Sequence, residues 1–233
     1  MELEQLSKRM HARSPRILST PHDAAVAAIL CPRSNGLELL YIERMRIPND
    51  PWSGHIAFPG GRVEPSDASL RATAERETRE EIDLNLQKEY YIGRLDDLQG
   101  ASLPVQVAAF VYAIDESHAA LSPNDEVHRA FWRPLEALCE PSRQCHHMLS
   151  KDGDHRAMPA IDVLGTRKPL LWGITYRFTA QLVHLLGHSL PLRLALVQHT
   201  VAKLLPLPLP CKEGAKSGRR AHVHVRKVRP MSM

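Results

Sequence analysis

The sequence is poor in cysteine, in aromatic residues and in long apolar runs. Its 233 residues include four cysteines and 5% Phe, Trp and Tyr. Cysteines that are few and unpatterned do not build a disulfide framework, and they favour a reducing compartment. No stretch of about 18 apolar residues exists, so the sequence holds no candidate transmembrane helix. The N-terminus lacks the apolar core of a secretory signal, and we therefore expect a cytoplasmic protein.

Positive charge is concentrated at the C-terminal end. The formal net charge is +4 at pH 7, and without the tail the chain is near neutral or slightly acidic, so nucleic-acid binding by the main domain is not implied. Residues 189–233 are proline-rich, then basic, and have little to bury, which predicts a disordered tail. The basic residues set against the single acid Glu213 are Lys212, Lys216, Arg219, Arg220, Arg226, Lys227 and Arg229.

The remaining composition is that of one globular domain. A hydrophobic content of 43% and a charged content of 24% are ordinary. We place the domain at residues 20–188, after a lead-in of residues 1–19 that can begin with a short amphipathic helix. Apolar runs predict strands at 24–31, 37–44, 89–95 and 105–114 and a strand pair around 151–154, and helical periodicity predicts helices at 69–82, 134–138 and 174–186.

The helix predicted at 69–82 carries three glutamates on one side. Steps of about 100° per residue bring Glu77, Glu80 and Glu81 within about a third of the circumference. Like charges at these spacings repel, and they oppose folding unless a counter-ion is present. A hard divalent cation such as Mg²⁺ or Mn²⁺ removes this repulsion, prefers carboxylate oxygens and commonly bridges them to substrate phosphates.

An ordinary charged surface helix is the alternative interpretation of the same glutamates. The preceding loop, Phe58-Pro59-Gly60-Gly61, favours the metal site, because its glycines permit backbone conformations closed to other residues. Such a loop lets a chain approach a helix, or a substrate, closely. Asp67, or Ser66 before it, is the expected N-cap of the helix.

The glycine loop, the acidic cap and the paired glutamates together resemble the Nudix hydrolase family. Its signature is G-x5-E-x7-R-E-U-x-E-E-x-G-U, in which U is apolar. The resemblance assigns metal binding and catalysis to Glu77, Glu80 and Glu81. It gives Arg76 a supporting role, in which it would fix the carboxylates by charge-assisted hydrogen bonds together with Asp67. It also implies the fold, an α/β/α sandwich with a mixed β-sheet.

Three positions depart from this signature. Asp67 stands for the first glutamate, and the gap from it to Arg76 is one residue longer. Thr78 takes the apolar position after Arg-Glu, and Asp83 takes the late glycine, although Asp tolerates positive φ better than most residues. The longer gap and the FPGG sequence resemble the coenzyme A pyrophosphatase branch of the family.

The segment before the glycines resembles that branch only in part. Its upstream motif is L-L-T-x-R-S-x3-R-x3-G-x3-F-P-G-G, and Gly54 fits it. Arg44 is one place off register, and Asn49 or Asp50 stands at the second arginine. The sequence therefore predicts weak discrimination between coenzyme A and other nucleoside diphosphate derivatives. In the same loop, Trp52 and His55 are candidates for substrate recognition, with packing against the domain as the alternative.

Other acidic and thiol residues are weaker candidates. Glu126 resembles an additional glutamate that the family recruits to the metal or the attacking water, and its alternative is an exposed acid before a strand. Asp96-Asp97 is interpreted as a solvated turn. Zinc is not favoured, because paired spacings such as C-x2-C are absent from the thiol and imidazole cluster of Cys139, Cys145, His146, His147 and His155.

The resemblance implies hydrolysis of a diphosphate bond in a nucleoside diphosphate linked to another moiety, with coenzyme A or a derivative as one substrate. Mg²⁺ or Mn²⁺ would be the cofactor. Glu80 or Glu126 would orient or deprotonate the water, while Gly60 and Gly61 would admit the substrate. The expected binding partner is a small molecule, and no membrane association is expected. A homodimer is possible on the sequence alone. A nucleotide-sensing module without catalysis is the alternative.

Overall fold

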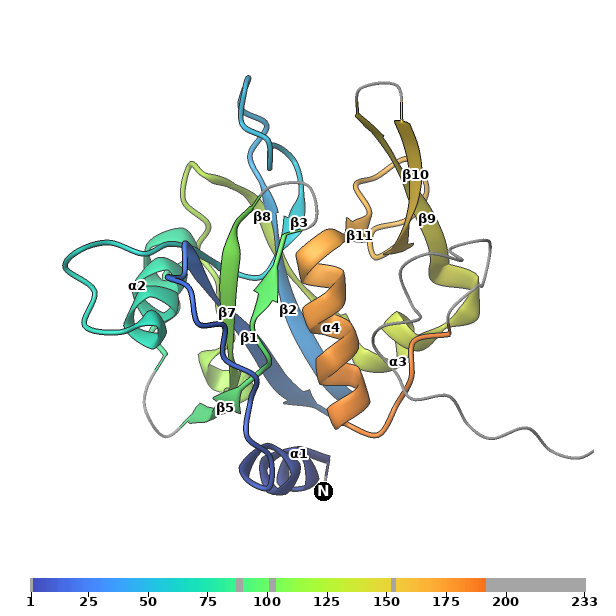
Figure 1. Ribbon diagram of the computed structural model, residues 1–233. Helices are drawn as coiled ribbons and strands as arrows, with labels where there is room; N and C mark the ends of the chain where they lie inside the picture. The colour runs from blue at the N-terminus through green and yellow to red at the C-terminus, as the bar shows by residue number, and fades with distance from the viewer. Residues whose placement is uncertain (1, 87–89, 101–103, 152–153, 192–233) are drawn as a thin grey trace, which may run out of the picture. The chain divides into compact units, whose positions relative to one another are not determined.

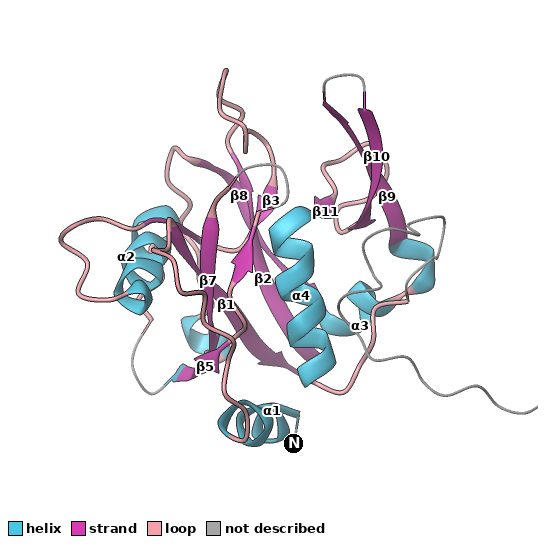
Figure 2. Ribbon diagram, in the orientation of Figure 1, coloured by secondary structure: helices cyan, strands magenta, loops and turns pink. Residues whose placement is uncertain are grey.

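The computed structural model describes residues 2–86, 90–100, 104–151 and 154–191. The tail predicted at 189–233 lies outside these residues from 192 onward. Secondary structure is coloured in Figure 2. The helices are α1 (Glu2–His11), α2 (Leu70–Ile82), α3 (Leu135–Cys139) and α4 (Gly173–Leu185). The strands are β1 (Ala24–Arg33), β2 (Gly36–Arg44), β3 (Ile56–Ala57), β4 (Gly60–Arg62), β5 (Tyr91–Arg94), β6 (Leu98–Gln99), β7 (Gln106–Ala113), β8 (Val127–Pro134), β9 (Gln144–Lys151), β10 (Asp154–Ile161) and β11 (Leu171–Trp172).

The large sheet is mixed, as the resemblance implies. Its strand order is β3-β2-β1-β7-β5, with β8 paired to β2, β4 to β1 and β6 to β7. β1 and β7 run parallel, whereas the other pairs, including the predicted hairpin of β1 and β2, are antiparallel. β4 is not predicted from the sequence, and its register places Gly60 opposite Val26. The glycine loop is therefore an edge of the sheet rather than a free connection.

Two helical layers cover the two faces of this sheet, which gives the predicted α/β/α arrangement (Figure 1). On one face, Ile29 of β1 packs in a core with Ala74 and Ile82 of α2. On the other face, Leu30 packs in a core with residues of α4 and α1. Because both faces are buried, β1 and β7 appear in the sequence as continuous apolar runs rather than as alternating ones.

A smaller sheet of three strands follows α3, in the order β11-β10-β9. The strand pair predicted around residues 151–154 is β9 and β10, which pair antiparallel along their length, and residues 152–153 of its turn lie outside the described ranges. β11 is too short to be recognised from periodicity. β11 contacts β3, the short edge strand of the large sheet that comes just before the glycine loop in the sequence. The small sheet therefore lies next to this edge of the large sheet.

The interpretation of Asp96-Asp97 as a solvated turn is wrong. Asp97 is fully buried and accepts hydrogen bonds from the Leu18 backbone at 2.9 Å and from the Arg94 guanidinium at 2.8 Å. His22 Nε2 lies 2.7 Å from the same carboxylate. Leu18 and His22 stand 79 and 75 positions before Asp97, and pairing with such distant residues leaves no local sequence signal.

Asp97→Ala is expected to lower the free energy of unfolding by about 2–4 kcal/mol, because it leaves the half-buried Arg94 and the Leu18 backbone N–H without their buried acceptor. Urea denaturation followed by circular dichroism measures the change. Glu4→Gln is a matched control, since Glu4 forms an exposed pair with Lys8 on α1, and we expect a change of about 0.5 kcal/mol or less. Equal effects of the two substitutions would contradict this account.

Candidate active site

Helix α2 begins and ends with caps that differ in part from those expected. Ser69 is the N-cap, and its side chain accepts a hydrogen bond from the Ala72 backbone at 3.1 Å. The prediction of Asp67 or Ser66 as N-cap is wrong, because the Asp67 carboxylate turns towards the middle of the helix. Asp83 is the C-cap with φ of 54°, so it adopts the left-handed conformation that the family signature gives to glycine.

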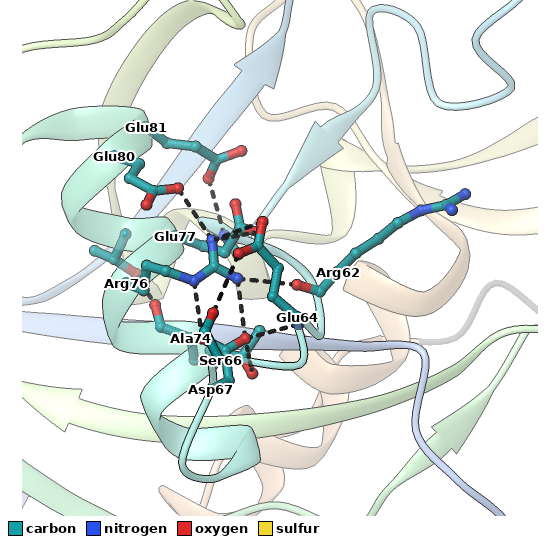
Figure 3. Close-up of polar contacts among 12 residues, drawn as sticks. Arg62, Glu64, Ser66, Asp67, Ala74, Arg76, Glu77, Glu80 and Glu81 are labelled. Carbon is teal, nitrogen blue, oxygen red and sulfur yellow. Dashed lines mark hydrogen bonds and ion pairs between the residues drawn. The ribbon is translucent and has the colours of Figure 1, made fainter.

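Arg76 links the acidic residues of this region into one network (Figure 3). Its Nε and Nη2 donate to the two carboxylate oxygens of Asp67, at 2.9 and 3.0 Å. Its Nη1 donates to Glu77 Oε1 at 3.1 Å and to Glu80 Oε2 at 3.0 Å. Nη2 also donates to the Arg62 carbonyl at 3.1 Å. The guanidinium therefore fixes the loop before the helix and two of the three predicted metal ligands.

Asp67 is the most strongly bound acid in the network. Hydrogen bonds from Arg76, from the Glu64 backbone N–H and from the Thr73 hydroxyl hold the pKa of Asp67 well below its usual range. The Asp67 side chain is 4% exposed, so these bonds are shielded from water. The predicted pairing of Arg76 with Asp67 is present, and it accommodates the residue that lengthens the gap between them.

Asp67→Asn is expected to lower the free energy of unfolding by about 2 kcal/mol at pH 7, since charge-assisted hydrogen bonds to Arg76 are lost. The folded pKa of Asp67 is depressed, so its contribution is present above the unfolded value of about 3.9 and is lost as the pH falls through the folded value. The difference in the free energy of unfolding between the wild type and Asp67→Asn should therefore be smaller at pH 3 than at pH 7. Urea titrations at both pH values measure it, and an unchanged difference would refute the assignment.

The two loop glycines contact the carboxylates directly. Gly60 has φ of 144°, and its N–H donates to Glu81 Oε2 at 2.9 Å. A Cβ on Gly61 would lie 2.4 Å from Glu77 Cδ. Both glycines were predicted to admit the substrate. The structure also gives them a structural role, because Gly61 makes room for the Glu77 carboxylate, while Gly60 packs against β1 and binds Glu81 through its N–H.

Glu77 and Glu81 are carboxyl groups whose charged forms the protein only partly stabilises. Glu81 is 2% exposed, and burial raises its pKa to about 8 against the opposing effects of the Gly60 N–H and Arg44. Burial also raises the pKa of Glu77, opposed by Arg76. The negative charges of nearby glutamates raise both pKa values further, and Glu126 contributes to each of them. Carboxyl groups whose charged forms are disfavoured in this way, beside a glycine loop, are typical of a cation site.

Glu126 and Glu80 are the exposed acids of the site. The loop that carries Glu126 is fixed by its neighbours: Asn124 N–H donates to the Glu81 carbonyl at 2.9 Å, and Met45 N–H donates to the Glu126 carbonyl at 2.8 Å. Glu126 was predicted either as a ligand or as an exposed acid, and it is exposed beside the other glutamates. Glu80 is 56% exposed and borders a surface depression lined by Arg76, Arg79, Glu80 and Asp83.

Trp52 and His55 contact different parts of the molecule. The Arg62 guanidinium lies 5.9 Å from the Trp52 ring centroid. His55 meets the edge of Trp172 at 5.1 Å, and Trp172 stacks on His147 at 4.1 Å between centroids. Trp172 and His147 were not predicted to lie near the site, because β9 and β11 are placed by tertiary contacts alone.

The thiol and imidazole residues weighed above as a zinc site are not gathered around one point. His147 stacks on Trp172, and His155 Nδ1 lies 2.6 Å from Ser150 Oγ at the other end of the β9–β10 pair. Within the described ranges, no three Asp, Glu, His or Cys side chains are arranged as a metal site. This also holds for the helix α2 glutamates, since Glu77 and Glu80 are turned towards Arg76.

Comparison with known proteins identifies the family. The NUDIX domain matches residues 21–151. The chain is 32% identical to human mitochondrial coenzyme A diphosphatase NUDT8 over 214 residues, 87% of this chain and 88% of that protein. It is 32% identical to the mouse protein of that name over 191 residues, with coverages of 80% and 89%. A MutT/nudix family protein from Enterococcus faecalis has a TM-score of 0.48 at 19% identity, covering 79% and 74% of the two chains. This chain therefore belongs to the Nudix family and is a pyrophosphohydrolase.

Proposed function

We propose that this protein hydrolyses the diphosphate bond of a nucleoside diphosphate derivative with the help of Mg²⁺ or Mn²⁺, and that coenzyme A is among its substrates. The observation that carries the proposal is the pair of carboxyl groups of buried Glu81 and half-buried Glu77, both with raised pKa values, next to Gly60 and Gly61. Relatives named coenzyme A diphosphatases, at 32% identity over most of the chain, support the substrate class.

The residues at this site fit a hard divalent cation. Their donors are carboxylate oxygens, which Mg²⁺ and Mn²⁺ prefer. Burial and like charges raise the pKa of Glu77 and of Glu81, and a cation there would relieve both effects. Glu77, Glu80 and Glu81 would hold it, and Glu80, exposed at the end of α2, would turn away from Arg76 to do so.

The chain's own residues divide the remaining work. When bound, the cation would neutralise charge on the diphosphate and make a nearby water more acidic. Glu80 or Glu126 would accept the proton of the attacking water. Arg76 would hold Glu77 in place through its bond to Oε1, while Asp67 holds Arg76. The Gly60 N–H would keep one oxygen of Glu81 directed away from the reacting groups.

A substrate panel tests the proposal. Coenzyme A, ADP-ribose, NADH, diadenosine polyphosphates and nucleoside triphosphates are incubated with Mg²⁺ or Mn²⁺, and the products are identified by mass. We expect cleavage of a diphosphate bond, with kcat/KM for coenzyme A less than about a hundredfold above the other substrates, because Asn49 or Asp50 replaces a cationic residue. A larger preference would contradict this, and binding without cleavage would favour the nucleotide-sensing alternative.

The cellular location stays a prediction. Within the described ranges, every helix is too short or too polar to cross a membrane. We propose a cytoplasmic protein on the composition of the chain, and the human relative differs in being named mitochondrial. Subcellular fractionation of the untagged, full-length protein distinguishes the two locations.

A further inference from the structure

Arg44 is a cation inside the candidate site that has no firm partner. Its Nη1 lies 3.6 Å from Glu81 Oε1, and its Nη2 lies 3.7 Å from Asp50 Oδ2. Both distances exceed those of ordinary N–H···O hydrogen bonds. Its Nε is buried with no hydrogen-bond partner among the residues that the structure describes. A guanidinium with five donors in a rigid fork is thus held beside the acids without being satisfied by them.

The backbone fixes Arg44 in this position. It is the last residue of β2, and its N–H donates to the His55 carbonyl at 3.0 Å. The next residue, Met45, donates to the Glu126 carbonyl at 2.8 Å. The strand end is therefore pinned between the loop that leads to the glycines and the loop that carries Glu126, and the Arg44 side chain projects towards Glu81.

Asp50 presents its carboxylate to Arg44 from a rigid turn. Its Oδ1 accepts a hydrogen bond from the Trp52 backbone at 3.0 Å, and its own N–H donates to the Ile47 carbonyl at 3.3 Å. The second oxygen is left to face the guanidinium, and the side chain is 17% exposed. The Asp50 carboxylate and the Arg44 guanidinium thus form an ion pair, but they are too far apart for a hydrogen bond.

We infer that Arg44 binds a phosphate oxygen of the substrate and that Asp50 competes with the substrate for it. The inference rests on the proposed function in one respect, that the substrate contains a diphosphate. The fork of an arginine matches phosphate oxygens better than a carboxylate held beyond hydrogen-bond distance. Binding would draw Arg44 away from Asp50, so Asp50 weakens the affinity for every diphosphate that enters the site.

The test measures binding rather than turnover. The probe is α,β-methylene-ADP, whose diphosphate cannot be cleaved, titrated calorimetrically with Mg²⁺ present into the full-length protein. We expect Arg44→Gln to weaken binding at least about tenfold, as for the loss of a charge-assisted hydrogen bond. Asp50→Asn keeps the acceptor for the Trp52 backbone but removes the charge, and it should tighten binding about threefold or more. In the Arg44→Gln background, Asp50→Asn should have no effect.

Two controls separate these effects from general electrostatics. Glu136→Gln changes the net charge by the same amount as Asp50→Asn on the exposed side of α3 and should leave the dissociation constant within about twofold. Arg46→Gln removes an exposed arginine two residues from Arg44 and should do the same. The inference is overturned if Arg44→Gln binds like the wild type, if Asp50→Asn fails to tighten binding, or if its gain persists without Arg44.

The outcome is independent of whether the protein cuts its substrate. If the substrate panel shows no hydrolysis but the Arg44 and Asp50 variants shift probe affinity as expected, the inference stands and the proposed catalysis fails. If hydrolysis is found but the variants bind the probe like the wild type, the proposed catalysis stands and the inference about Arg44 and Asp50 fails. Should Arg44→Gln not fold, as judged by circular dichroism, Asp50→Asn and Arg44→Lys decide: an unchanged affinity for Asp50→Asn overturns the competition.

Discussion

Glu81→Gln is expected to lower kcat by about a thousandfold or more while the fold is retained. The amide is close in size to the carboxylate, and its oxygen can still accept the Gly60 N–H bond. It no longer carries the charge that a divalent cation requires at this buried position. Turnover of the best substrate in the panel, at saturating Mg²⁺, measures the loss, and near-normal turnover by a folded variant would refute the role given to Glu81.

The same substitution should stabilise the metal-free protein. Burial raises the pKa of Glu81 to about 8, above its unfolded value of about 4.3. The wild type therefore loses stability as the pH rises from the unfolded value through the folded one, and the Gln variant does not. At pH 8 in EDTA we expect the variant to be more stable by about 2–4 kcal/mol, and at pH 4 the two should be equal. Urea titrations at both pH values give the difference.

Glu75→Gln is the matched control on the same helix. Glu75 lies on the other side of α2, where it accepts a hydrogen bond from the Tyr112 hydroxyl at 3.0 Å. An amide oxygen can accept the same bond, so turnover should stay within about twofold of the wild type. A large loss in this variant would mean that any charge change on α2 impairs the enzyme, and the Glu81 result would lose its meaning.

Gly61→Ala is expected to lower kcat/KM by about tenfold to a hundredfold with little loss of stability. The added Cβ would lie 2.4 Å from Glu77 Cδ, and the group it meets is the end of a flexible side chain. The carboxylate can move, so the fold tolerates the methyl group, but Glu77 leaves its position. Misplacement of a ligand by about 1 Å is enough for a loss of this size.

Gly60→Ala provides the contrast, because the same methyl group meets backbone there. Its Cβ would lie 2.4 Å from the Ala25 carbonyl oxygen, and φ of 144° strains any residue with a side chain. This variant should lose stability by about 2 kcal/mol or more, whereas Gly61→Ala should not. Thermal unfolding beside steady-state kinetics separates the two effects. Equal melting temperatures for the variants would show that the loop is more plastic than its contacts indicate.

The central strands of the large sheet were predictable because their signals are local. The runs at 24–31 and 105–114 are apolar on both faces, and the structure buries them between α2 and α4. The glutamates of α2 follow from helical spacing and from the family signature. Thr78 departs from that signature without harm, since its hydroxyl donates to the Ala74 carbonyl at 2.6 Å and its buried oxygen is satisfied.

Pairings between distant segments were not predictable. Asp67 was predicted as a helix cap because caps are recognised from residues one turn away, and only the family resemblance suggested its pairing with Arg76, nine positions on. Asp97 looked solvated because nothing near it in the sequence announces His22 or the Leu18 backbone. The stacking of His147 on Trp172 depends on how β9 and β11 are placed, which no periodicity describes.

The network around Arg76 also bears on the order in which this protein matures. Small domains that depend on a metal for their stability cannot fold before it arrives, since nothing else opposes the repulsion of their ligands. Here Arg76 already pairs with Asp67, Glu77 and Glu80. Arg76 thus pairs with the acids that the proposed cation would bind, so with the proposed metal dependence the chain would fold without the ion and become active only when it binds. Scarcity of the ion would then silence the enzyme without removing it, and restored supply would revive existing molecules without new synthesis.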